Sequence, residues 1–238
     1  TTEIYPLSLH DALPILSEDR LMKTRLFNDV KMTIQPADPD NPNIRDLLVE
    51  VDESQTGSLN FGMMAGSDSG LFGNISLNQR NFDVLDWPES WEEFWQRKAF
   101  IGAGQQFSMA FQPGDKIFNY EISLTDPRFL DTDYSVGGTA GYKRQDYGDY
   151  TQNSLFSRFN VGRRFGDIWY GGISLVANRN ELTDIDTNVP LEVFNDRGPS
   201  TINSLGISVT RTTLKPFIMP TEGSHTRLHI DQFGLPAG

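Results

Sequence analysis

The side chains that could carry out chemistry in this chain are few and poorly spaced for it. His225, His229 and Asp231 come nearest to a metal-binding group, but residues four apart on a strand lie about 13 Å apart, too far to share one ion. Residues 184–188, DIDTN, begin like a calcium loop, yet its sixth position is not glycine and Asn195 stands where such a loop needs a glutamate. We therefore expect no catalytic residue, no metal site and no cofactor, and we predict that the protein is not an enzyme.

Composition narrows the class of protein further. The 238 residues include no cysteine, which excludes disulfides, thiol catalysis and cysteine–zinc sites. The formal net charge of −12 leaves no basic excess to neutralise phosphates, so nucleic acid is not an expected partner. No segment approaches the roughly 18 consecutive apolar residues of a membrane helix. A transmembrane β-barrel stays compatible with this composition, because its strands are only half apolar.

The elements that the sequence does predict are β-strands. Residues 57–66, GSLNFGMMAG, and residues 71–78, LFGNISLN, carry apolar side chains at alternate positions. A period of two is typical of strands with one apolar and one polar face. Seven further segments alternate in the same way, namely 99–111, 117–125, 134–144, 154–164, 168–178, 200–213 and 224–233. About nine strands of this kind predict an all-β fold with an antiparallel sheet.

The length of these strands bears on whether the apolar face meets lipid or a protein core. Several segments reach the roughly 9–11 residues of a tilted membrane strand, whereas strands of soluble proteins are usually about five or six residues long. Acidic or polar connections also alternate with connections that contain aromatic residues, as expected for the two unlike rims of a barrel. The pattern favours a partial transmembrane β-barrel, and a soluble all-β binding protein is the alternative.

The barrel interpretation predicts which way each side chain points. One set should face lipid: Leu59, Phe61, Phe107, Phe111, Ile122, Leu175, Ile207 and Ile230. The other set should face the lumen: Asn60, Ser108, Glu121, Arg158, Ser208 and Asp231.

The chain before residue 55 has a different pattern. Residues 1–16 resemble a translated sequencing adapter and are left out of the fold prediction. Residues 17–27 predict a short helix, and residues 28–36 and 44–54 predict two strands joined by a turn. This order is typical of the second half of a small α+β module. We therefore predict a partial module over 17–54 and a barrel segment over 55–238, in a fragment of a longer protein.

A short amphipathic helix is predicted over residues 86–98. Pro88 suits the first turn of a helix and Asp86 can cap it. An aromatic stripe at helical spacing then packs on the rim of the barrel or against the preceding module, or lies in the lipid interface, and a disordered segment is the remaining alternative. The residues of this stripe are Trp87, Trp91, Phe94 and Trp95.

Several motifs resemble the BamA family of outer-membrane assembly factors, in the order in which that family has them. Residues 49–82, VEVDESQTGSLNFGMMAGSDSGLFGNISLNQRNF, are similar to the junction between the last POTRA domain and the first two barrel strands. YEISLTDPRF at 120–129 and PFIMPTEGSHTRL at 216–228 resemble two later turns. The resemblance implies a barrel of sixteen strands, of which this chain holds about nine, preceded here by the C-terminal part of the last POTRA domain. The related TamA and two-partner secretion transporters share this scheme.

The resemblance also implies a function and a site. Such a protein inserts unfolded β-barrel proteins into the outer membrane, with accessory outer-membrane lipoproteins as partners and its POTRA part in the periplasm. The first strand would pair weakly with the last, open sideways and template an incoming strand through its backbone. The implied site residues are Gly57, Ser58, Leu59, Asn60, Phe61, Gly62 and Met63. A translocation pore of the TamA or two-partner secretion type is the alternative function.

Overall fold

The computed structural model describes residues 18, 21–22, 24–36, 45–92, 99–214 and 221–234. The chain divides into two compact units, Thr1–Thr56 and Gly57–Gly238. The adapter-like residues 1–16 lie outside the described residues. Within the described part, no helix is long and apolar enough to cross a membrane.

The first unit contains an antiparallel pair of strands, β1 (Phe27–Pro36) and β2 (Arg45–Glu53). Glu18, Leu21 and Met22 before it are helical, and Val30 of β1 is buried. The expected helix and two strands are therefore present in this order, and the predicted turn between the strands lies outside the described residues. The helix prediction is wrong at its C-terminal end, because residues 24–26 form a turn and Phe27 already begins β1. Arg25 has a φ of 58°, a left-handed conformation that cannot continue a helix.

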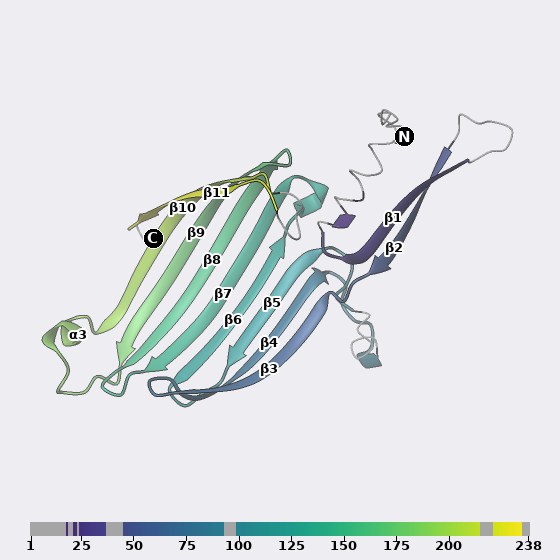
Figure 1. Cartoon of the computed structure of the whole chain (residues 1–238). Coiled ribbons are helices and arrows are strands. Elements are labelled where there is room, and N and C mark those ends of the chain that lie inside the picture. Colours follow the sequence, from purple (N-terminus) through teal and green to yellow (C-terminus); the bar gives the residue numbers. More distant parts are fainter. Residues whose placement is uncertain are drawn as a thin grey trace. The chain divides into compact units, whose positions relative to one another are not determined.

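The second unit is a single antiparallel sheet of nine strands, in which each strand pairs with its neighbours in sequence (Figure 1). This confirms the all-β prediction and the expected number of strands. The short helices η1 (Phe129–Asp131) and α3 (Leu191–Asn195) lie in connections. The strands are β3 (Gly57–Gly66), β4 (Gly70–Phe82), β5 (Gln105–Gln112), β6 (Ile117–Asp126), β7 (Tyr134–Asp146), β8 (Thr151–Phe165), β9 (Trp169–Thr183), β10 (Gly198–Thr212) and β11 (His225–Phe233).

The strand predicted from residue 99 begins only at Gln105. Three residues before it have left-handed backbone angles, with φ of 60° at Phe100, 134° at Gly102 and 69° at Gly104. Such angles break a strand. The Gly104 N–H instead donates to the Asn81 side-chain oxygen at 3.0 Å, which fastens this connection to the end of β4.

The pairing register shows that the sheet has one apolar and one polar face. Residues directly opposite each other in an antiparallel pair lie on the same face, so the faces can be followed from strand to strand. Leu59, Phe61, Phe107, Phe111, Ile122, Leu175, Ile207 and Ile230 all lie on one face. Asn60, Ser108, Glu121, Arg158, Ser208 and Asp231 all lie on the other. The predicted division into two opposite faces is therefore confirmed.

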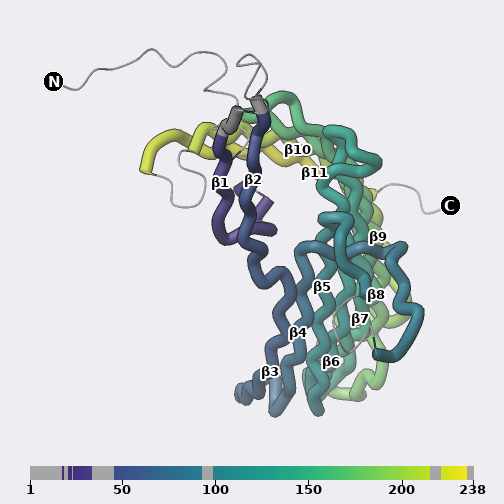
Figure 2. Tube along the Cα trace, turned by 90° about the vertical axis from the view of Figure 1, so that its right-hand side faces the viewer, coloured from purple at the N-terminus to yellow at the C-terminus, as the bar shows by residue number. Residues whose placement is uncertain are grey.

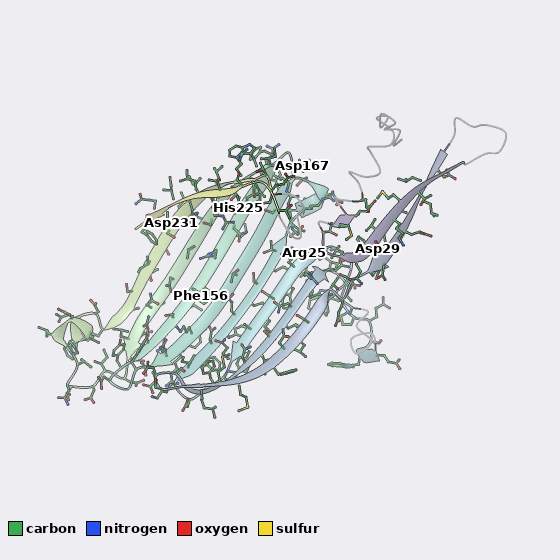
Figure 3. The ribbon with its side chains drawn as sticks, viewed as in Figure 1. Arg25, Asp29, Phe156, Asp167, His225 and Asp231 are labelled. Atoms are coloured by element: carbon green, nitrogen blue, oxygen red, sulfur yellow. The ribbon has the colours of Figure 1, made fainter. Side chains whose placement is uncertain are left out.

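The polar face is crowded and hydrogen-bonded across the strands. Ser154 donates to Asn180 at 2.7 Å, and the hydroxyls of Ser135 and Tyr170 lie 2.8 Å apart. A Cβ added at Gly141 would collide with the Phe156 ring, whereas the apolar face is open and most of its large side chains are exposed. The sheet is curled (Figure 2), and the crowding indicates that its polar face is the concave one. Figure 3 marks Phe156, His225 and Asp231, which belong to this face.

The connections meet at two rims of different composition. We call one the acidic rim; it consists of residues 67–69, 113–116, 147–150 and 184–197. We call the other the aromatic rim; it consists of residues 83–104, 127–133, 166–168 and 213–224. The predicted alternation of connection type is present only in part, because residues 166–168 contain no aromatic side chain and the acidic rim includes Tyr147 and Tyr150. Length does not separate the rims, since each combines short connections with at least one long one.

Candidate functional site

The strand predicted to act, β3, forms one edge of the sheet. It pairs with β4 continuously from Gly57↔Gln79 to Gly66↔Gly70. Within the described residues no strand pairs with its other side, and the same holds for the outer side of β11. An edge strand presents unpaired backbone N–H and C=O groups that can bond to another strand. This arrangement gives Gly57–Met63 the backbone geometry that β-augmentation requires.

The side chains of β3 are divided between the two faces. Leu59, Phe61 and Met63 lie on the apolar face, and Phe61 and Met63 are 72% and 77% exposed. Ser58, Asn60 and Gly62 lie on the polar face, where Asn60 donates to the Ser76 hydroxyl at 3.4 Å. The strand is therefore held to the sheet by its bonds to β4 and by little side-chain packing.

Gly62 is not a glycine that packing requires. An added Cβ would meet only the Asn74 Cβ, at 4.0 Å. Its φ is not among the positive ones. A larger residue would therefore fit, and since glycine lowers the stability of a strand interior, Gly62 weakens β3 without a steric reason.

The aromatic stripe is described only in part. Trp87 and Trp91 are 70% and 80% exposed, and Trp87 packs edge-on against Phe100 at 5.3 Å. Phe94 and Trp95 lie outside the described residues, as does most of the predicted helix. Among the described residues of the predicted helix only Trp91 and Glu92 are helical.

The role predicted for Asp86 differs in the structure. Its carboxylate accepts a hydrogen bond from the Ile101 N–H at 3.2 Å, and its carbonyl accepts one from Phe100 at 2.9 Å. Asp86 therefore joins the two ends of the connection between β4 and β5, and in the described part of the chain it caps no helix. A helix N-terminus and the returning chain at residues 100–101 both offer backbone N–H groups to this carboxylate. In the structure it bonds to the returning chain.

The strand ends next to the aromatic rim carry a group that the sequence analysis did not identify. The Arg163 guanidinium lies 5.0 Å from the Tyr134 ring centroid and 5.3 Å from that of Phe165. Arg211 lies 6.0 Å from the Trp169 ring centroid. All five residues are on the apolar face at strand ends, and we call them the arginine–aromatic patch. The sequence did contain a signal for this group. Arg163 and Phe165 are two positions apart at the end of a strand, so their side chains lie on the same face.

The histidines considered for metal binding do not converge. His225 bonds through Nδ1 to the Thr212 hydroxyl at 2.7 Å, while His229 Nε2 lies 2.8 Å from the Asp231 carboxylate. Both histidines are on the polar face of β11, each with its own partner. In the 184–188 segment, Asp186 Oδ1 accepts from the Thr187 N–H at 2.6 Å, which closes the loop on itself.

Comparison with known protein families shows to which family the chain belongs. A family model for the Omp85 superfamily domain matches residues 100–238, more than half of the chain. The chain belongs to the Omp85 superfamily. This membership and the curled sheet with its outward apolar face bear out the expected outer-membrane localisation, and they set aside the soluble alternative.

Individual relatives within the Omp85 superfamily resemble most of the chain. The outer membrane protein assembly factor BamA of Nitratidesulfovibrio vulgaris is 26% identical over 93% of this chain. The protein of the same name from Neorickettsia risticii is 23% identical over 89% of it. The chain spans 26% of the length of each of these two relatives.

A solved structure shares the fold. The crystal structure of BamA from Haemophilus ducreyi lacking POTRA domains 1–3 aligns with a TM-score of 0.58 and 20% identity. The alignment covers 93% of this chain and 42% of that chain. The expected similarity to a BamA barrel is therefore confirmed at the level of fold.

Proposed function

We propose that this chain is part of an outer-membrane assembly factor that inserts unfolded β-barrel proteins through a lateral gate at β3. The observation that carries the proposal is Gly62, which weakens the interior of β3 without a packing reason, on a strand whose apolar side chains are exposed. Backbone groups of such an edge can template the strand of a client by β-augmentation. The relatives named as outer membrane protein assembly factors support the same assignment.

The proposed mechanism uses hydrogen bonding and needs no covalent step. In the complete protein, β3 would close the barrel against its last strand and separate from it when a client arrives. The seam between β3 and the last strand would open at low cost if few side-chain contacts hold it, and Gly62 adds none. The proposed partners are unfolded outer-membrane proteins, accessory outer-membrane lipoproteins and the surrounding lipid. The alternative from the same superfamily, a TamA-type or two-partner secretion pore, would move its cargo through the lumen and keep the seam closed.

A disulfide lock tests the gate. The chain has no cysteine, so Ser58→Cys can be combined with one cysteine on the last strand of the complete protein. The oxidised variant should fold yet fail to insert clients into proteoliposomes, and reduction should restore insertion. Insertion is followed by the heat-modifiable mobility of the client on gels.

The matched control locks a seam that need not open. Asn60→Cys with Ser76→Cys joins directly opposite residues of β3 and β4 and should leave insertion unchanged. Normal insertion with β3 locked to the last strand would contradict the lateral-gate mechanism. Normal export of a single partner protein under the same lock would favour the secretion pore.

A further inference from the structure

The arginine–aromatic patch lies where an outward-facing sheet meets a membrane interface. Tyr134 is directly opposite Arg163, and Phe165, Trp169 and Arg211 are directly opposite one another on three successive strands. All belong to the apolar face and adjoin the aromatic rim. Aromatic residues at this level normally mark the boundary between hydrocarbon and headgroups. Two arginines on the same face place positive charge at that boundary.

Neither arginine forms an ion pair with another described residue. In the part of the chain that the structure describes, ion pairs join Lys31 to Asp29 and His229 to Asp231, and none involves Arg163 or Arg211. Arg211 donates one hydrogen bond, to the Ser224 hydroxyl at 3.1 Å. Within the described residues both guanidiniums are therefore open to an anion from outside the protein. An anion from outside the protein is the complementary partner.

The rings around Arg163 hold its side chain in place. With aromatic centroids at 5.0 and 5.3 Å, the guanidinium lies within cation–π range of two rings. Its position is therefore set before a ligand arrives, which lowers the entropy lost on binding. A guanidinium presents forked N–H donors that match the oxygens of a phosphate.

The surroundings of the patch distinguish a lipid from a free anion. On β8 to β11 the row beyond Arg163 toward the middle of the sheet is apolar and consists of Val161, Ile173, Ile207 and Ile230. Across β7 and β6 it continues as Val136 and Asp126. Ile173 and Ile207 are about half exposed. A molecule with its phosphate at the arginines would therefore lay hydrocarbon chains along these side chains. Free phosphate would make only the polar half of these contacts.

We propose that the arginine–aromatic patch binds the phosphate headgroup of an anionic phospholipid in the leaflet that meets the aromatic rim. Arg163 and Arg211 contact the phosphate, and the isoleucines beyond them contact the acyl chains. This inference depends on the outward direction of the apolar face and not on the gate at β3. Its failure and the failure of the proposed function are therefore distinguishable.

The test measures lipid retention by the complete, detergent-solubilised protein. Delipidated protein is incubated with equimolar phosphatidylglycerol and phosphatidylcholine, and bound lipids are counted by native mass spectrometry. The wild type should retain phosphatidylglycerol preferentially. Replacing Arg163 and Arg211 by Gln should weaken that retention about tenfold, the size of one or two lost charge-assisted hydrogen bonds. Excess inorganic phosphate should not displace the lipid.

Arg164 supplies the matched control. It is the next residue of β8 and carries the same charge, but it lies on the polar face opposite Tyr170. Arg164→Gln should leave phosphatidylglycerol retention unchanged. Equal loss in this control, undiminished retention in the double variant, or release by inorganic phosphate would each overturn the proposal.

A conservative variant covers the case in which the double variant does not fold, as judged by heat-modifiable mobility. Arg163→Lys keeps the charge and removes the forked donors. It should lower retention by less than the glutamine substitution does. Retention equal to that of the wild type would show that the guanidinium makes no specific contact and would contradict the proposal.

Discussion

Replacing Leu175 by arginine should destabilise the protein strongly, because Leu175 lies at the middle of the apolar band. On β9 it lies four positions after Gly171, next to the arginine–aromatic patch, and four positions before Arg179 on the same face. At about 3.4 Å per residue this is about 13 Å along the strand, or about 10 Å of depth at a strand tilt of about 40°. An arginine at this position cannot bring its charge to either polar boundary by snorkelling.

The expected cost of Leu175→Arg is about 2–4 kcal/mol in the free energy of unfolding, as for an arginine at the bilayer midplane. Ile173→Arg lies half as far from the aromatic rim and should cost about 1–2 kcal/mol. Ser208→Arg places the same side chain on the polar face and should cost less than about 1 kcal/mol. The depth of the residue and the face it occupies are thus tested separately.

The measurement is a denaturant titration of the complete protein in phospholipid vesicles, with the folded fraction read from heat-modifiable mobility. The order of cost should be Leu175, then Ile173, then Ser208. A cost for Ser208→Arg equal to that for Leu175→Arg would refute the assignment of the faces. Equal costs at Leu175 and Ile173 would refute the placement of the band's centre.

Three further variants test the packing, the gate and the aromatic rim. Gly162→Ala places a Cβ against the Tyr170 hydroxyl and should lower stability by about 1–3 kcal/mol through overpacking; an unchanged denaturant midpoint would contradict this packing. Gly62→Ala should stabilise the protein by about 0.5–1 kcal/mol and slow client insertion, and faster insertion would argue against a weak β3. Trp87 and Trp91 should be quenched by brominated lipids in the wild type, with the quenched signal lost when both are Ala; no quenching would mean that they pack on protein.

The sequence by itself determined the strands and their two faces. Alternation of side chains is a local property of an extended backbone, so Leu59, Phe61 and Leu175 could be assigned to one kind of surface before any pairing was known. The beginning of β5 could not be predicted in this way. Ile101 is apolar and in phase with Phe107 and Met109, and only the left-handed φ angles around it, as at Phe100 and Gly104, show that the strand has not yet begun.

Tertiary structure alone decided which strands and side chains are neighbours. The edge position of β3 depends on the pairing of all nine strands, and no alternation within residues 57–66 can show it. The arginine–aromatic patch likewise brings Tyr134 of β7 against Arg163 of β8, and Trp169 of β9 against Arg211 of β10. Register sets these contacts, because a shift of one residue would move each partner to the other face of the sheet.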